Sequence, residues 1–210
     1  MSDISIITES FPGLSPEVIS KIERFKEIFT DWNAKINLVS RRDIDNFYQN
    51  HVLHSLCIAK FTDFPDGIKV LDIGTGGGFP GIPLAIFFPN VHFTLVDSIR
   101  KKMDAVRSMA EALGLDNVTV INSRAEALDL KVDFVVSRAT APLSDLVVWS
   151  KGKFFHKSLA SIPNGIICLK GGDLAEELLP FKKKVFIEPV TSYIKDSFFE
   201  EKKIVYLPMV

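Results

Sequence analysis

The residues best suited to chemistry in this sequence form a glycine-rich run. Residues 71–81 read LDIGTGGGFPG and hold four glycines within five residues, Gly74, Gly76, Gly77 and Gly78. Glycine lets a backbone turn sharply and approach a ligand closely, and the exposed amides at the start of a following helix favour a polar or anionic group. A tight turn by itself needs only about one or two glycines. We therefore interpret the run as a ligand-binding loop.

Phe79 and Asp97 narrow the class of ligand. The dinucleotide fingerprint G-x-G-x-x-G requires a third glycine where this chain has Phe79, because that glycine lets the helix pack closely beside a pyrophosphate. The Gly-Lys-Ser/Thr ending of the phosphate loop is also missing. Asp97 ends the next predicted strand, about 20 residues after the glycines, where an acid accepts both ribose hydroxyls. We expect a nucleoside ligand without a pyrophosphate, although Asp97 could also, or instead, cap the following helix.

Two further loops carry polar residues after predicted strands. Residues 123–126 read SRAE after the third strand, and residues 137–139 read SRA after the fourth. An arginine directly after a buried strand is rarely there for packing. Arg138 could pair with Asp97, Asp72 or a ligand carboxylate, or it could form a purely structural ion pair. The sequence leaves both interpretations open.

The elements that must position these residues alternate between strand and helix. Apolar runs predict strands at 68–73, 91–96, 118–121, 133–136 and 165–169, and helices are predicted at 101–113, from 142 to about 155, and at 174–181. Two strand-like runs in the tail, 185–194 and 203–207, could pair antiparallel. This order predicts an α/β fold with a doubly wound, Rossmann-like sheet of about seven strands whose last hairpin is antiparallel. Ligands of such sheets bind at the carboxyl ends of the strands.

The first 65 residues show a helical pattern instead. Ser15 is a predicted N-cap, Pro16 occupies the first helical position and Glu17 lies in the first turn. One apolar helix face follows, made of Val18, Ile22, Phe25, Phe29, Trp32 and Ile36. A second helix is predicted from about 43 to 60. We expect residues 1–65 to form an N-terminal helical region and residues 66–210 the ligand-binding domain.

Composition excludes several classes of protein. Hydrophobic residues make up 47% and charged residues 24% of the chain, which is typical of a globular protein rather than a disordered one. A net charge of -1 gives no strongly basic footprint of a dedicated nucleic-acid-binding module. Cys57 and Cys168 are too few for a disulfide framework or a zinc site, and His51 and His54 lack zinc-pair spacing. Without a membrane span or signal peptide in the sequence, we expect a cytoplasmic protein that binds neither a membrane nor a metal.

Several runs together resemble the RsmG (GidB) family of bacterial methyltransferases. They are GTGGGFPGIPLA at 74–85, LVDS at 95–98 followed by Lys101 and Lys102, and SRA at 137–139. Asn37-Leu38 and the segment from His51 to Leu56 fit the same pattern, so the resemblance spans about residues 36–171. It implies that the cofactor is S-adenosyl-L-methionine, that the reaction is N7-methylation of a guanine in 16S ribosomal RNA, and that the partner is the small ribosomal subunit. On this basis residues 66–210 would be the methyltransferase domain.

The resemblance also implies roles for individual residues. Gly74 and Phe79 would line the methionine and ribose side of the cofactor, with Gly76 and Gly78 in the same loop. The backbone of Ala125 and Glu126 would lie beside the adenine, and Arg138 would reach the cofactor or substrate side. Thr140 stands where a hydrophobic residue is expected in this pattern. The basic residues best placed to bind RNA are Arg41, Arg42, Arg100, Lys101 and Lys102.

Guanine chemistry sets an expectation about catalysis. N7 carries an in-plane lone pair without a hydrogen, so its methylation requires no base, and we expect catalysis by positioning rather than by a catalytic side chain.

We also expect the protein to be a monomer. Two rivals remain: a non-enzymatic RNA- or ribosome-binding protein with a nucleoside pocket, and an NAD-linked oxidoreductase, which Phe79 disfavours.

Overall fold

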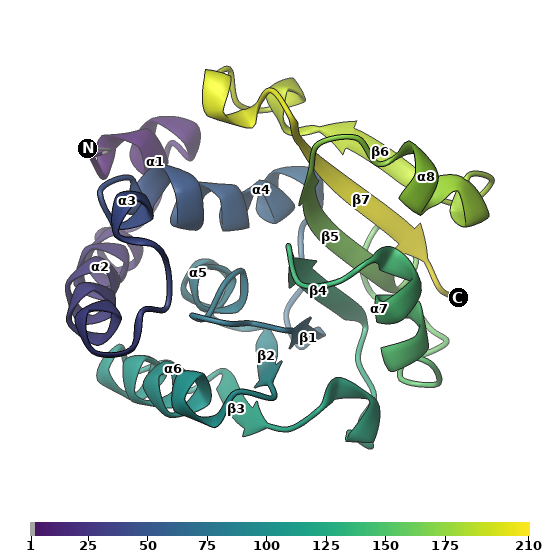
Figure 1. Ribbon diagram of the computed structural model, residues 1–210, viewed down its shortest axis with the longest axis horizontal. Helices are drawn as coiled ribbons and strands as arrows, with labels where there is room; N and C mark the ends of the chain where they lie inside the picture. The colour runs from purple at the N-terminus through teal and green to yellow at the C-terminus, as the bar shows by residue number, and fades with distance from the viewer. Residues whose placement is uncertain (1–2) are drawn as a thin grey trace.

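The protein is built around one seven-stranded sheet with the order β3-β2-β1-β4-β5-β7-β6 (Figure 1). The computed structural model describes residues 3–210, except for the side chains of Arg41 and Arg42. The strands are β1 (Lys69–Ile73), β2 (His92–Asp97), β3 (Val118–Asn122), β4 (Phe134–Arg138), β5 (Gly165–Gly171), β6 (Phe186–Pro189) and β7 (Lys202–Pro208). β1 to β5 are parallel, whereas β7 runs antiparallel to both β5 and β6. The predicted sheet and its antiparallel last hairpin are confirmed.

The strand order creates a switch point between β1 and β4. From β1 the chain moves outward through β2 to β3, and it then returns to place β4 and β5 on the other side of β1. Loops that leave β1 and β4 therefore diverge at their carboxyl ends, which opens a crevice there. The Ser137 hydroxyl donates to the Ile73 carbonyl at 2.8 Å and ties the two strand ends together.

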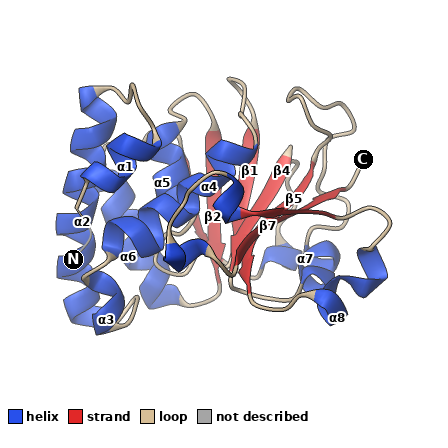
Figure 2. Cartoon of the chain, turned by 90° about the horizontal axis from the view of Figure 1, so that it is seen from above, coloured by secondary structure: helices blue, strands red, loops and turns tan. Residues whose placement is uncertain are grey.

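Six helices that begin in the first half of the described chain cover one face of the sheet. They are α1 (Ser5–Ser10), α2 (Pro16–Ile36), α3 (Arg41–Ile44), α4 (His54–Phe61), α5 (Gly81–Phe87) and α6 (Arg100–Ala112) (Figure 2). Helices α4, α5 and α6 contact the strands, and α2 packs against α5 and α6. The α2 prediction is confirmed: the Ser15 hydroxyl accepts from the Val18 amide at 3.3 Å, and Asn37 ends the helix with φ 50°. These helices share one apolar core with the sheet. The division of the chain at residues 65 and 66 stays a prediction.

The single helix predicted from about 43 to 60 is wrong. α3 ends at Ile44, and a π-helix (Tyr48–Leu53) leads directly into α4. Apolar periodicity cannot separate these segments, because a π turn differs from an α turn only by one inserted residue. The π-helix contains a residue that contacts the site. The Asn50 carbonyl accepts a hydrogen bond from the Arg138 guanidinium at 3.0 Å.

The opposite face carries α7 (Leu143–Trp149) and α8 (Ala175–Leu178), which cover a second apolar core (Figure 1). α7 is shorter than predicted, because the chain leaves the helix at Trp149 and turns at Gly152, whose φ is +74°. α8 is also shorter, and a 3-10 turn (Leu179–Phe181) that contains a proline replaces its second half. The predicted strand at 185–194 stops at Pro189, after which the 3-10 turn Val190–Ser192 follows. Between residues 3 and 210, no helix has the length and apolarity to cross a membrane.

Candidate active site

The glycine loop follows β1 directly and is fixed to the neighbouring strand. The amides of Gly74 and Thr75 both donate to the carbonyl of Val96, at 2.9 and 3.1 Å. Gly74, Gly76 and Gly78 have φ of +71°, +57° and +95°, a region that side chains disfavour. At Gly74 a Cβ atom would lie 2.1 Å from Cγ2 of Thr140. The loop therefore needs glycine at this position for space as well as for conformation.

Asp97 connects the glycine loop to the start of α6. Its Oδ2 accepts from the Gly76 amide at 3.1 Å, and its Oδ1 accepts from the Ile99 amide at 2.9 Å. The second bond lies in the turn before α6, whose N-cap is Ile99 and receives no side-chain capping bond, so the interpretation of Asp97 as the N-cap is wrong. Each carboxylate oxygen has a further lone pair. Asp97 can therefore hold the loop and still accept from ribose hydroxyls.

A hollow of about 150 Å³ lies beside Asp97 at the carboxyl edge of the sheet. It brings together residues from three loops that the sequence singled out, namely Gly74, Asp97, Ser123, Arg124, Ala125 and Glu126. Ala125 and Glu126 belong to a short 3-10 helix (Ala125–Ala127) after β3. This hollow has the place and the polar walls that the adenosine part of a nucleoside ligand requires.

A second hollow of about 360 Å³ continues from the first along the glycine loop. It shares Gly74, Asp97 and Thr140 with the first hollow and adds further wall residues, among them Leu38, Gly76, Phe79, Lys102 and Arg138. Two joined hollows suit an elongated ligand with a nucleoside at one end and a small polar group at the other.

Phe79 supports the loop from below rather than covering a ligand. Its side chain is only 2% exposed. The ring packs 5.6 Å from Phe25, 5.2 Å from Phe29 and 5.0 Å from His51, measured between ring centroids. A bulky ring therefore occupies the position where a dinucleotide site has a glycine.

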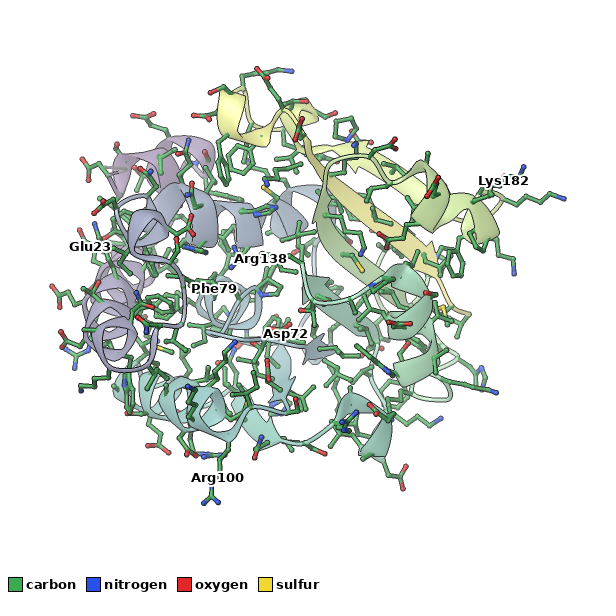
Figure 3. All side chains as sticks on the ribbon, viewed as in Figure 1. Glu23, Asp72, Phe79, Arg100, Arg138 and Lys182 are labelled. Carbon is green, nitrogen blue, oxygen red and sulfur yellow. The ribbon has the colours of Figure 1, made fainter. Side chains whose placement is uncertain are left out.

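Arg138 makes a different set of contacts from those predicted. In the part of the chain that the structure describes, it forms no ion pair with Asp97 or Asp72. Its Nη1 donates to the Asn50 carbonyl and its Nη2 contacts Nδ1 of His51, both at 3.0 Å. The guanidinium also lies 4.8 Å above the Phe79 ring (Figure 3). Burial lowers the pKa of Arg138 to about 10, which leaves it charged at neutral pH.

Asp72 is a buried acid that sequence reasoning considered only as a partner of Arg138. Its Oδ2 accepts from the Gly81 amide at 2.9 Å, whereas Oδ1 makes no hydrogen bond to the residues that the structure describes. Burial raises the pKa of Asp72 to about 7. A Cβ at residue 81 would lie 2.7 Å from this carboxylate, so a glycine is required here as well. The signal in the sequence was an acid in the middle of an otherwise apolar buried strand.

The residues expected to bind RNA differ in their surroundings. The Arg100 side chain is 86% exposed and only 4.0 Å from Asp104, and Lys101 is also exposed. Lys102 is half-buried and lines the second hollow, so it lies at the rim of the site. Arg41 and Arg42 begin α3, but their side chains lie outside the described residues.

The residues present fit S-adenosylmethionine. The glycine loop turns sharply at Gly74, Gly76 and Gly78, the space beside Gly76 is open among the described residues, and Asp97 lines both hollows. The fold agrees with this. A SAM-dependent methyltransferase from Aquifex aeolicus is similar with a TM-score of 0.56 and 19% identity, covering 82% of this chain and 100% of that chain. An rRNA methylase from Streptococcus thermophilus has a TM-score of 0.51 and 10% identity over 75% of this chain and 95% of that chain.

The fold is Rossmann-like, and together with the family match it defines the class of protein as a methyltransferase that uses S-adenosylmethionine. Residues 18–205 match the GidB family, described as rRNA small subunit methyltransferase G. The chain belongs to this family. A ribosomal RNA small subunit methyltransferase G from Parabacteroides distasonis is 49% identical over 99% of this chain and 90% of its own length. The protein of the same name from Bacteroides thetaiotaomicron is 50% identical over 97% of this chain and 98% of its own length.

Proposed function

We propose that this protein transfers the methyl group of S-adenosylmethionine to N7 of a guanine in 16S ribosomal RNA. The family to which the chain belongs supports the reaction, and the two hollows that meet at Gly74, Asp97 and Thr140 support the cofactor's position. The partner in this proposal is the small ribosomal subunit. A monomeric state and a cytoplasmic location stay predictions.

Each wall of the two hollows has a role in this proposal. The backbone of Gly74, Gly76 and Gly78 surrounds the methionine part, Asp97 accepts from the ribose hydroxyls, and Ala125 and Glu126 border the adenine. Asn50 and His51 hold Arg138 in place. In this proposal Arg138 packs on the Phe79 ring and so supports the glycine loop from the protein interior. When bound, the cofactor supplies an electrophilic methyl group on a sulfonium.

The chain's own task is to orient the acceptor. Guanine N7 has a free lone pair, so no side chain must remove a proton before attack. The walls hold the acceptor in line at roughly 3 to 3.5 Å and exclude water. In this proposal no acid of the site acts as an essential base. A pH–rate limb that disappears when a single carboxylate is replaced would contradict this part.

The family match argues against the oxidoreductase alternative, whereas the glycine loop alone does not, because residues 76–81 keep the G-x-G-x-x-G spacing. The non-enzymatic RNA-binding alternative predicts no specific stabilisation by the cofactor. Thermal shift with S-adenosylhomocysteine, S-adenosylmethionine and NAD separates the three functions. We expect stabilisation by the first two compounds only. Stabilisation by NAD alone, or by none of them, would contradict the proposal.

Radiolabelled methyl transfer tests the acceptor directly. Isolated small subunits, naked 16S ribosomal RNA and a protein pool are offered in parallel, and modified RNA is mapped at nucleotide resolution. We expect label only in RNA, as 7-methylguanosine at one position. Label at a ring nitrogen other than N7, or in protein, would overturn the proposed acceptor.

A further inference from the structure

A third cavity lies beyond Thr140, on the side away from Asp97. Its volume is about 420 Å³, and its wall includes His54, Thr140, Pro142, Lys170, Glu177 and Lys202. The loop after β4, the end of β5 and the start of β7 enclose it. Thr140 is the residue that lines this cavity and both hollows of the cofactor site. The reacting centre of a cofactor bound along the glycine loop would therefore face this cavity.

The backbone at this junction is held in an unusual conformation. Ala139 has φ +52°, which costs a non-glycine residue about 1 to 2 kcal/mol. The turn at Ala139 brings the Thr140 hydroxyl to the Gly74 carbonyl, to which it donates at 2.9 Å. Ala139 and Thr140 line both the second hollow and the third cavity, and the Thr140 hydroxyl fixes this shared wall to the glycine loop.

Glu177 offers a fixed carboxylate on the opposite wall. Its Oε1 accepts from the Leu143 amide and from the ammonium of Lys170, each at 2.8 Å. Lys170 is fixed in turn, because it also donates to the Ala141 carbonyl at 2.8 Å. Among the described residues no partner contacts Oε2 of Glu177. One carboxylate oxygen therefore remains available to donors of a ligand.

His54 is a buried polar side chain without a partner in the same wall. It is 7% exposed, and its Nε2 makes no hydrogen bond within the described part of the chain. Phe198 and Phe199 pack edge-on against its ring at centroid distances of 6.2 and 5.9 Å. Burial, with the nearby charge of Arg138, holds the pKa of His54 well below its usual value, so the ring is neutral. An unsatisfied buried nitrogen is costly unless a ligand pairs with it.

We propose that this cavity binds the acceptor guanine and that Glu177 recognises its Watson–Crick edge. Guanine presents two adjacent donors there, N1–H and the N2 amino group, which suit a free carboxylate oxygen, whereas adenine presents an acceptor at N1. Continuing around the ring, O6 comes next on the wall that His54 lines, where the Nε2–H tautomer of the neutral ring would donate to it after a small shift that uncovers the nitrogen, and N7 then points past Thr140 to the cofactor site. This inference rests on the proposed function, and it adds the residues that select the base.

The test combines an enzyme variant with a base analogue. Small subunits are assembled from 16S RNA that carries either guanosine or inosine at the modified position, and inosine lacks only the N2 amino group. For the wild-type protein we expect inosine to lower kcat/KM for methyl transfer about tenfold, the effect of one hydrogen bond to a charged group. Glu177→Gln removes the charge and retains the size of the side chain. It should lower kcat/KM for guanosine and reduce the inosine penalty to within about twofold.

Two controls separate base recognition from damage to the fold. Glu176→Gln changes the exposed neighbouring acid on α8 and should keep the full inosine penalty. Glu177→Gln also breaks the ion pair with Lys170, so we expect it to lower the melting temperature, but all variants should retain the wild-type S-adenosylhomocysteine affinity. A purely structural role of Glu177 would lower the melting temperature and leave the inosine penalty as it is in the wild type.

His54→Phe provides a second test, because it keeps an aromatic ring and removes both nitrogens. We expect kcat/KM to fall at least about tenfold while S-adenosylhomocysteine still binds. If Glu177→Gln keeps the wild-type inosine penalty, or if His54→Phe keeps wild-type kcat/KM, the acceptor pocket is overturned. If the wild-type protein forms neither 7-methylguanosine in the guanosine RNA nor 7-methylinosine in the inosine RNA, the proposed function itself fails.

Discussion

Arg138 Nη2 lies 3.0 Å from Nδ1 of His51, a contact that joins two residues 87 positions apart in the chain. A guanidinium has only donors, so Nδ1 of His51 must accept and the imidazole must be neutral. Burial and the Arg138 charge agree with this, because they lower the pKa of His51 to about 3. The contact connects the carboxyl end of β4 to the π-helix and so joins the sheet to the N-terminal helices.

The neutral state of His51 predicts a loss of stability in acid. The unfolded chain takes up a proton near pH 6.5, whereas the folded chain does so only near pH 3. The contribution is therefore complete above pH 6.5 and is lost as the pH falls towards 3, by at most about 1.4 kcal/mol per pH unit. His51→Gln retains an acceptor for Arg138 without a titrating ring. We expect urea denaturation between pH 4 and 7 to show a flatter slope for this variant.

The exposed His156 gives a matched control for that measurement. His156→Gln should leave the acid slope of the free energy of unfolding as it is in the wild type. If His51→Gln and His156→Gln change the slope equally, the neutral buried imidazole is not the cause.

The raised pKa of Asp72 predicts that the free energy of unfolding changes with pH in the opposite direction. Its folded pKa of about 7 lies above the usual value of 3.8 for an aspartate, so between these pH values the folded chain holds a proton that the unfolded chain has lost. The free energy of unfolding therefore falls as the pH rises through this window, by up to about 1.4 kcal/mol per unit, and the full cost is present above pH 7. Asp72→Asn keeps an acceptor for the Gly81 amide. We expect it to stabilise the protein at pH 8 and to remove this slope.

Chemical denaturation from pH 4 to 8 measures the effect, with Asp104→Asn on the exposed face of α6 as the comparison. A destabilised Asp72→Asn variant at pH 8 would contradict the prediction, since it would mean that the carboxylate is stabilised in its charged form.

Alanine substitutions at Gly74 and Gly114 separate two effects of adding a Cβ atom, namely backbone strain and a steric clash with a neighbouring side chain. Alanine at this position must adopt φ +71°, and its Cβ would lie 2.1 Å from Cγ2 of Thr140. Gly114→Ala has nearly the same strain, at φ +61°, with no atom within 4 Å of the new Cβ. We expect each to lose about 1 kcal/mol of stability from strain. Only Gly74→Ala should also abolish S-adenosylhomocysteine binding in calorimetry.

The double variant Gly74→Ala, Thr140→Ser removes Cγ2, the nearest of the three Thr140 atoms that the new Cβ would meet, and leaves Oγ1 and Cβ at 2.6 and 2.8 Å. We expect it to recover part of the cofactor affinity while remaining as strained as the single variant. If Thr140→Ser recovers no affinity, the close approach of Gly74 and Thr140 does not control the shape of the site.

The glycine loop, Asp97 and the residues after β3 and β4 could be placed from the sequence because the signals are local. A strand that enters a glycine run fixes the loop, and parallel strands bring their carboxyl ends to one edge. The partners of Arg138 could not be placed in this way. They depend on how the N-terminal helices pack over the sheet, and a single inserted residue in the π-helix decides that Asn50 and His51 face it.

The third cavity could not be predicted from the sequence either. Glu177 lies in a segment predicted only as a helix, and His54 was one of two histidines without metal spacing. Neither residue is part of a motif that includes the other. β5, β7 and α4 must be in place before these side chains meet beside Thr140, so the site is a product of tertiary structure alone.

The last prediction concerns RNA binding by the basic residues at the N-terminus of α6. Arg100 and Lys101 project from the carboxyl edge of the sheet, and Lys102 lines the cofactor site. Arg100→Glu, Lys101→Glu should weaken binding to small subunits without changing S-adenosylhomocysteine affinity. Each lost phosphate contact should also reduce the dependence of log K on log salt by about 0.7 to 0.9. Titration over a range of KCl concentrations measures both effects.

Lys182 and Lys183 provide the control, because Lys182 lies on the opposite side of the molecule from Arg100 (Figure 3). Lys182→Glu, Lys183→Glu makes the same change in net charge. If the two double variants weaken subunit binding equally, the effect follows from total charge and not from contacts at α6. If only the α6 variant loses affinity and salt dependence, the RNA approaches across the carboxyl edge of the sheet, which is the side from which a base can reach Thr140.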